Sequence, residues 1–191
     1  DHIFPAEKDN EEFSKLYDPI LQNLTEARHV KDKAVELIKG HTQKVMMGEV
    51  SRFDGKSLHI EENIGIDLNI WFKDFFIRGK IATDMMIHLA KFLGYNISFV
   101  FAEEEKFEKE KKKLLLTKPG GITDYLLDLI TDHRNQWYKP FVKMRIAIEH
   151  HGYQLPEIKY GLTPESKAIV IFPIIEGRNI PDLLNMLWEN L

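Results

Sequence analysis

The feature that most restricts the fold is a stretch of apolar residues at helical spacing between Leu68 and Leu93. Large apolar side chains recur there every three or four residues, and Gly94 follows directly. This spacing predicts a helix with a broad buried face that ends at the glycine. Within it, Trp71, Phe75 and Phe76 are interpreted as core residues. The chain is therefore expected to be mainly α-helical.

A second helical pattern precedes this one and covers about Asn10 to Ile38. Pro19 is expected to kink or split this helix, because proline lacks the backbone N–H that a helix interior uses. Gly40 is a natural stop for it. Residues 1–9 are expected to form a loose arm, and residues 41–66, which contain three glycines, an irregular connection.

The middle of the chain predicts further helices separated by a clear break. Acidic residues precede basic ones in the segment 102–113, which is typical of a solvated helix. Residues 118–121 interrupt the pattern with proline and glycine. Thr123 is the expected N-cap of a helix that runs to about His150, and Pro140 is expected to split it.

The C-terminal part changes character and predicts a β-hairpin followed by a helix. Glu157–Leu162 and Lys167–Phe172 are expected to be strands, joined by a turn at 163–166. The final helix is expected from Ile180 to Leu191, with Asn179 as its cap.

These elements fit one domain over residues 1–191, with a helical bundle at about 10–152 and the hairpin and closing helix at about 153–191. The 26 basic and 30 acidic residues give a net charge of −4, so no overall basic field indicates nucleic-acid binding. The absence of cysteine excludes disulfides, thiolate metal sites and a cysteine nucleophile. No apolar run is long enough to span a bilayer, and a cytoplasmic protein without membrane contacts is expected.

One short segment carries side chains suited to phosphodiester chemistry. Arg145 and His150 lie five residues apart at the predicted end of a helix, and His151 and Gly152 follow. A histidine titrates near neutral pH, so it can take a proton from a ribose 2′-hydroxyl or give one to the leaving oxygen. An arginine stays charged and can hold the phosphate.

The geometry of a straight helix separates this pair. At about 100° per residue, side chains five apart point roughly 140° away from each other. Either the helix unwinds before Gly152, or two copies of the chain supply one composite site. A purely structural interpretation is also open: Arg145 pairs with Glu149 one turn later, while His150 and His151 favour the helix C-terminus.

An aromatic-led helix that ends in Arg-x4-His-His-Gly, after a long helix bearing Arg78 and Asp84, resembles the HEPN superfamily (higher eukaryote and prokaryote nucleotide-binding domain). The resemblance covers about residues 68–152. It implies an all-α bundle, and often a metal-independent ribonuclease of a toxin–antitoxin or other defence system that works as a homodimer. Carried over, Arg145 contacts the phosphate or orders the site, and His150 is catalytic. His151 matches a longer spacing used in the same superfamily.

Two functions follow from this resemblance. The first is a HEPN-like metal-independent endoribonuclease with Arg145, His150 and His151 as catalytic residues and Asp84 and Glu149 around them. The second is a non-catalytic HEPN-like interaction domain or a nucleotide- or RNA-binding domain, because active members usually carry a polar residue where this chain has Ile146. The implied partners are a second copy, RNA, and an antitoxin or other protein.

No cofactor and no metal ion are expected. His150, His151, His88 and Asp84 could supply nitrogen and oxygen ligands. However, adjacent histidines seldom bind one ion from a regular helix, and His88 is interpreted as a core or interface residue. Asp84, if buried, would need a charged partner, for which Arg145 or Arg78 is expected.

Overall fold

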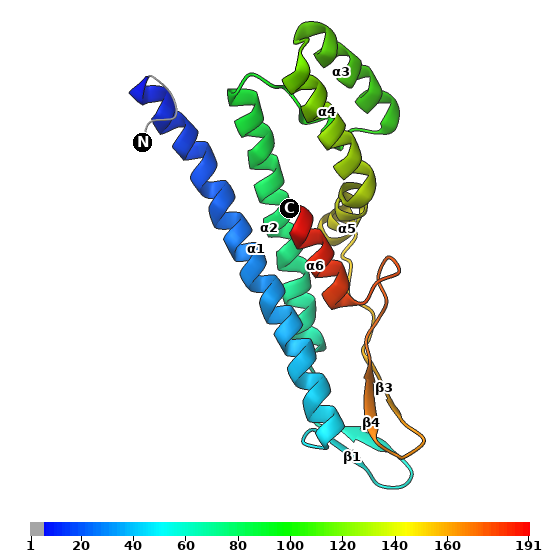
Figure 1. Cartoon of the computed structure of the whole chain (residues 1–191). Coiled ribbons are helices and arrows are strands. Elements are labelled where there is room, and N and C mark those ends of the chain that lie inside the picture. Colours follow the sequence, from blue (N-terminus) through cyan, green and yellow to red (C-terminus); the bar gives the residue numbers. More distant parts are fainter. Residues whose placement is uncertain (1–5) are drawn as a thin grey trace.

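Two long antiparallel helices form the spine of the molecule. The structure, a computed structural model, describes residues 6–191. Helix α1 (Glu7–Met47) and helix α2 (Gly65–Phe92) lie side by side and run in opposite directions (Figure 1). The 41 residues of α1 span about 60 Å, so this helix reaches from one end of the molecule to the other. The predicted mainly helical fold is confirmed.

Helix α1 continues past both residues that were expected to interrupt it. Pro19 lies inside the helix, and Gly40 does not end it. The buried face includes Ile38, His41 and Val45, so packing carries the helix across the glycine. The chain leaves the helix at Gly48, which has a positive φ of 75° that glycine adopts without strain. Residues 7–9 of the expected arm are helical, and residues 1–5 lie outside the described residues.

A short β-hairpin follows α1 where an irregular connection was expected. Strands β1 (Ser51–Phe53) and β2 (Leu58–Ile60) pair antiparallel. Asp54 shapes the turn, because its Oδ1 accepts hydrogen bonds from the backbone N–H groups of Lys56 (2.9 Å) and Ser57 (2.8 Å). These two bonds, with a third from His59, lower the pKa of Asp54 to about 2.

The middle of the chain forms one continuous helical rod, residues 121–150, and a separate helix, residues 104–117, which lies beside the start of the rod. A 3₁₀ turn, η1 (Ser98–Phe101), leads into α3 (Glu104–Thr117), and α4 (Gly121–His133) follows the predicted break. A π-helical turn, η2 (Arg134–Tyr138), joins α4 to α5 (Lys139–His150). Pro140, at the start of α5, lacks the backbone N–H that an α-helix uses at this point. The chain therefore widens into a π-helical turn and the helix continues, where a break was expected. The predicted cap was wrong: Gly120 holds that position, and Thr123 is buried in the helix.

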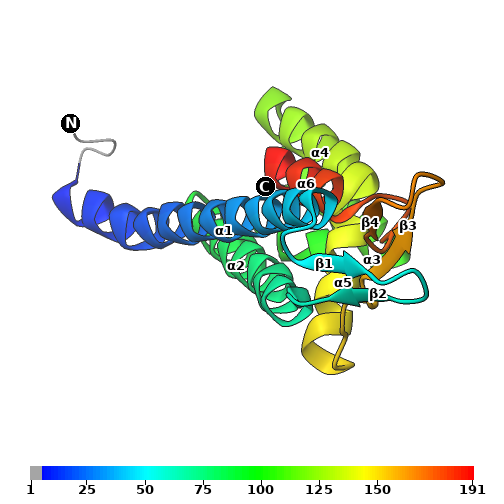
Figure 2. The same ribbon diagram turned by 90° about the horizontal axis from the view of Figure 1, so that it is seen from below.

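The predicted C-terminal elements are confirmed. Strands β3 (Lys159–Leu162) and β4 (Ala168–Ile171) pair antiparallel, and α6 (Ile180–Asn190) begins after Asn179, whose side chain accepts a hydrogen bond from the N–H of Asp182 (2.8 Å). Strand β2 contacts β3 and β1 contacts β4, so the two hairpins lie together at one end of the molecule (Figure 2).

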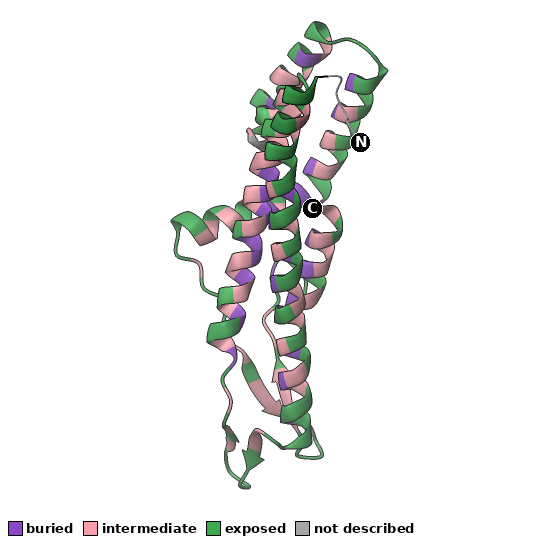
Figure 3. Ribbon diagram, turned by 90° about the vertical axis from the view of Figure 1, so that its left-hand side faces the viewer, coloured by how far each residue is buried: buried purple, intermediate pink, exposed green. Residues whose placement is uncertain are grey.

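The core lies between α1, α2, η2, α5 and α6, where aliphatic side chains of α1 and α6 surround a cluster of aromatic rings from α2, η2 and α5. Phe72, Phe75 and Phe76 are fully buried, the last two as predicted, and the ring of Phe76 stacks on Phe141 of α5 at 5.2 Å between centroids. Trp71 packs on the edge of this cluster. Figure 3 shows the buried positions along the helices, whereas the strands carry none. Among residues 6–191, no helix combines the length and the apolar character that crossing a membrane requires.

Candidate functional site

The last turn of α5 brings Arg145 and His150 together through a third residue. Arg145 Nη1 lies 3.1 Å from Glu149 Oε2, and His150 Nε2 lies 3.9 Å from the same oxygen atom. The guanidinium and the imidazole therefore approach each other within the sum of these two distances. This happens in an intact helix, because the long arginine side chain reaches along the axis and His150 is the last helical residue. The helix is intact from Arg145 to His150 and ends there, so no unwinding between the two residues is needed to bring them near one carboxylate.

The three side chains differ in their access to solvent. Arg145 and Glu149 keep 20% and 25% of their side-chain surface exposed, whereas His150 keeps 65%. The predicted ion pair between Arg145 and Glu149 is confirmed, and its partly covered position shields it from solvent. His150 is open to any molecule that approaches the end of α5.

His151 faces a different part of the surface. It lines a groove of about 650 Å³ between α5 and the start of α3, together with Ile146, Lys139 and Lys143, whereas Arg145 and His150 are not among the residues that line it. Both lysines are engaged: Lys139 Nζ lies 2.9 Å from a carboxylate oxygen of Glu104, and Lys143 Nζ lies 2.9 Å from a carboxylate oxygen of Glu176. The structure therefore divides the predicted catalytic residues into a pair and one separate histidine.

Asp84 does not have the partner that was expected. Its carboxylate is about half exposed and lies 2.6 Å from Lys80 Nζ, one turn earlier in α2. Arg78 pairs with Glu26 of α1 and with Asp74. An Arg145 or Arg78 partner was expected only for a buried Asp84; the residue is half exposed, and a lysine one helical turn away pairs with it.

Tyr138 links Arg145 and Asp84 electrostatically. Its ring is buried, and this burial raises the pKa of the Tyr138 hydroxyl. The positive charge of Arg145 opposes the shift and the negative charge of Asp84 adds to it. The two charged groups thus act on one buried hydroxyl, although they do not contact each other in an ion pair.

The residues considered as metal ligands do not form a cluster. His88, interpreted as a core or interface residue, is exposed and so does not lie in the core. Within the part of the chain that the structure describes, no group of three or more His, Asp or Glu side chains is arranged to hold a metal ion.

A second cluster of ionisable side chains lies near the two hairpins, and the sequence analysis missed it. The side chain of His41 in α1 is only 1% exposed. Its Nδ1 lies 2.9 Å from Glu62 Oε2, and its Nε2 lies 2.9 Å from the hydroxyl oxygen of Tyr160 in β3. Lys44 Nζ lies 2.7 Å from the other oxygen of Glu62. The one available sequence signal was a histidine within the apolar stripe of α1, because its partners are 21 and 119 residues away.

The electrostatics of this cluster fix the direction of its hydrogen bonds. Hydrogen bonds from Lys44 and then His41 lower the pKa of Glu62, so its carboxylate is ionised at neutral pH and only accepts. Nδ1 of His41 therefore donates to Glu62. Burial raises the pKa of Tyr160, and the charge of Glu62 adds to the effect, so the phenol keeps its proton. With a neutral imidazole, that proton is donated to His41 Nε2.

Comparisons with known proteins give no relative for this chain. No protein-family model, no curated protein and no solved structure matches it. The function is accordingly argued from the two clusters themselves: Arg145, Glu149 and His150 at the end of α5, and His41, Glu62 and Tyr160 beside the hairpins.

Proposed function

We propose that this chain is a HEPN-like helical protein of the toxin or defence type and acts as a metal-independent endoribonuclease. The observation that carries the proposal is the convergence of Arg145 Nη1 and His150 Nε2 on one oxygen of Glu149. The mainly helical fold and the Arg-x4-His spacing at the end of a helix also support it.

The position of the Glu149 carboxylate indicates where an anion sits between the two side chains. A phosphate group is also negatively charged and also offers a pair of oxygens, so it could replace the carboxylate against the guanidinium, which binds either group with two parallel hydrogen bonds. Arg145 would then stabilise the charge that builds on the phosphoryl oxygens. The proposed substrate is RNA because its 2′-hydroxyl supplies the nucleophile.

His150 is the proposed acid–base group. As base, the imidazole takes the proton of the 2′-hydroxyl, whose oxygen attacks phosphorus while the bond to the 5′-oxygen breaks. The leaving oxygen needs a proton in the same step, which one imidazole cannot both take and give. A homodimer in which the exposed ends of two α5 helices face each other would supply a second His150, and His151 beside Lys139 and Lys143 would contact the RNA chain. An antitoxin or another protein that covers the end of α5 would regulate it.

Cleavage of a mixed RNA pool in excess EDTA tests the proposal. The wild type is expected to cleave, and His150→Ala and Arg145→Ala are each expected to lose at least a hundredfold in rate, the usual contribution of a positioned acid–base or oxyanion-stabilising group. His29→Ala, at an exposed histidine of α1, is the matched control and should cleave normally. Wild type that does not cleave at high concentration, or cleavage that survives both substitutions in folded protein, would overturn it.

One observation favours the second function, a non-catalytic interaction, nucleotide-binding or RNA-binding domain. Ile146, which follows Arg145, is 37% exposed and places an aliphatic side chain where active HEPN proteins usually carry a polar one. Ile146→Asn discriminates the two functions when the wild type is inactive, because a gain of cleavage indicates a nuclease site that has lost its polar group. Glu149→Gln discriminates further: it frees Arg145 and should tighten RNA binding only if phosphate competes for that arginine.

A further inference from the structure

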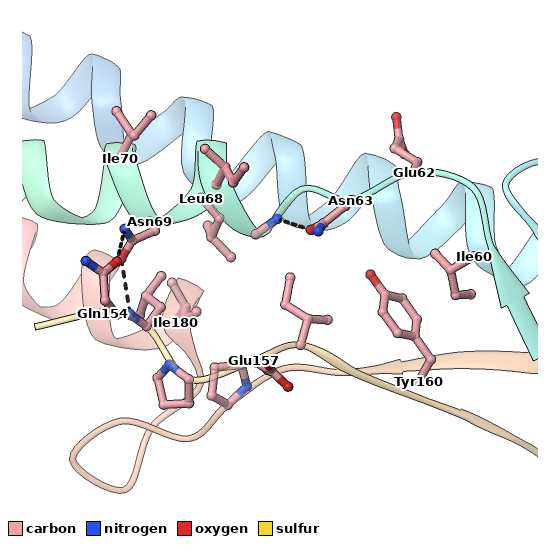
Figure 4. A pocket seen from close by; sticks show the side chains of 16 residues that line it. Ile60, Glu62, Asn63, Leu68, Asn69, Ile70, Gln154, Glu157, Tyr160 and Ile180 are labelled. Carbon is pink, nitrogen blue, oxygen red and sulfur yellow. Dashed lines mark hydrogen bonds between the residues drawn. The ribbon is translucent and has the colours of Figure 1, made fainter.

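A cavity of about 580 Å³ opens between the start of α2 and residues 154–160 (Figure 4). Its volume falls in the range of sites that hold small organic ligands. Most of its wall is aliphatic, formed by Ile60, Ile66, Leu68, Leu155, Ile158 and Ile180. Such a wall favours the apolar part of a ligand, which gains by leaving water.

Most polar groups of the cavity are already engaged with each other. Asn69 Nδ2 donates to the side-chain oxygen of Gln154 (2.7 Å), and Asn69 Oδ1 accepts from the N–H of Leu155 (3.1 Å), as Figure 4 shows. The two oxygens of Glu62 bind Lys44 and His41. Two acceptors of the lining remain for a ligand, the hydroxyl oxygen of Tyr160 and the exposed carboxylate of Glu157, which makes no ion pair with any described residue. Asn63 and Gln154 use their side-chain oxygens as acceptors within the chain, which leaves their amide N–H groups as the donors of the lining.

The buried histidine turns the Tyr160 oxygen into a hydrogen-bond acceptor. Glu62 holds the proton of His41 on Nδ1, so the lone pair of a neutral imidazole at Nε2 accepts the hydroxyl proton of Tyr160. The phenol oxygen then has lone pairs but no proton to offer. In Figure 4 the Tyr160 ring reaches from β3 toward the segment that carries Glu62 and Asn63. A ligand that meets this oxygen must therefore donate a hydrogen bond.

The charge of the lining selects among donors. The sixteen residues that line the cavity include two glutamates and no lysine, arginine or histidine. Lys44 balances the charge of Glu62, so Glu157 supplies the net negative charge of the lining. A cationic donor is attracted to such a lining, whereas a carboxylate or phosphate is repelled. We infer that this cavity binds a small amphipathic ammonium compound, with its N–H groups on the Tyr160 oxygen and near Glu157 and its apolar chain against the isoleucine and leucine wall.

Titration of the 191-residue chain with hexylammonium, followed by amide NMR at pH 8, tests the inference. An alkylammonium carries its positive charge at this pH. The expected result is saturable shifts at residues 62–70 and 154–160, weaker binding of hexanol and no binding of hexanoate. Tyr160→Phe should weaken hexylammonium binding about tenfold, the effect of a lost hydrogen bond to a charged group. Tyr125→Phe, at an exposed tyrosine of α4, is the matched control and should bind as the wild type does.

Because Tyr160→Phe also removes a contact of the buried His41, Glu157→Gln provides an independent variant at an exposed residue. Its expected effect is a loss of about threefold in affinity for hexylammonium and none for hexanol, since only the charge changes. Equal binding of hexylammonium and hexanoate, shifts elsewhere in the chain, or unchanged affinity in both variants would overturn the inference. None of these outcomes depends on RNA cleavage, so the test is separate from that of the nuclease proposal.

Discussion

Gly79 of α2 lies so close to the ring of Phe141 in α5 that a β-carbon at residue 79 would stand 2.9 Å from Phe141 Cζ. Leu191 approaches the same point, with its Cδ1 3.1 Å away. Glycine inside a helix is unfavourable by about 1 kcal/mol relative to alanine. Here the missing side chain gives room to the stacked rings of Phe76 and Phe141 and brings α2 close to α5.

We expect Gly79→Ala to lower the free energy of unfolding by about 1–2 kcal/mol. Overpacking a filled core is unfavourable by about 1–3 kcal/mol, which exceeds the gain in helix propensity. Thermal unfolding measures the change. Gly40→Ala is the matched control, because Gly40 also lies inside a helix but a β-carbon there meets nothing within 4 Å. This substitution should raise the free energy of unfolding by up to about 1 kcal/mol. Stabilisation by both substitutions would contradict the close packing at Gly79.

Arg134 is predicted to hold η1 and α3 against the helical rod. Its buried guanidinium donates to the Val100 carbonyl (3.1 Å), lies 3.3 Å from a Glu104 oxygen and covers the ring of Phe107 at 4.4 Å. Lysine cannot reproduce this planar set of contacts, so Arg134→Lys should lower the stability by about 2 kcal/mol. Hydrogen exchange should accelerate first in residues 98–117. Arg28→Lys, at an exposed arginine of α1, should change neither quantity.

The Glu62 carboxylate should make the stability depend on acid pH. Hydrogen bonds from Lys44 and His41 lower its pKa below the ordinary value of 4.5 in the folded chain. Its contribution is therefore present above pH 4.5 and is lost as the pH falls through the lower folded-state pKa. Relative to Glu62→Gln, the wild type should be more stable by up to about 1 kcal/mol at pH 7 and equal to the variant in strong acid. Urea unfolding at several pH values checks this.

Glu36→Gln serves as the control for that pH series. Glu36 is an exposed residue of α1 that forms no ion pair with any residue from 6 to 191. The wild type and Glu36→Gln should therefore have nearly the same free energy of unfolding at every pH. A difference between the wild type and Glu62→Gln that grows toward acid pH would reverse the predicted sign.

Helix α6 should depend on its N-cap. The Asn179 side chain accepts from the N–H of Asp182, one of the groups that has no partner within the helix. Asn179→Ala should lower the free energy of unfolding by about 1 kcal/mol, whereas Asn179→Ser, which keeps an acceptor, should lose less. The midpoint of urea unfolding measures both. Equal losses in the two variants would show that the hydrogen bond is not what stabilises this end of the helix.

The sequence predicts those elements whose signals are local. The apolar spacing of α2, the β-branched strand at 168–171 and the Asn179 cap each depend on neighbouring residues, and all three are confirmed. The stop predicted at Gly40 is wrong because a buried face continues through it, an effect of packing against distant residues. The hairpin at 51–60 escaped prediction because its three-residue strands are too short to show a period of two.

The two clusters of ionisable side chains also differ in how far their members are apart in the sequence. Arg145, Glu149 and His150 are close in sequence, so their proximity in space was partly predictable, and only the convergence on one oxygen needed the structure. His41, Glu62 and Tyr160 come from a helix, a loop and a strand. No spacing rule joins them, because the contact between the two hairpins and the end of α1 places them together.

The π-helical turn at Arg134–Tyr138 sets the direction in which the side chains of α5 point relative to those of α4. A π turn holds about one residue more than an α turn, and each residue of an α-helix advances it by about 100°. Deletion of one residue here would leave both helices intact but rotate α5 by roughly that angle relative to α4. Phe141 would then leave the aromatic core while the spacing of Arg145 and His150 stayed the same. A single inserted residue thus decides which side of the molecule this arginine and histidine face.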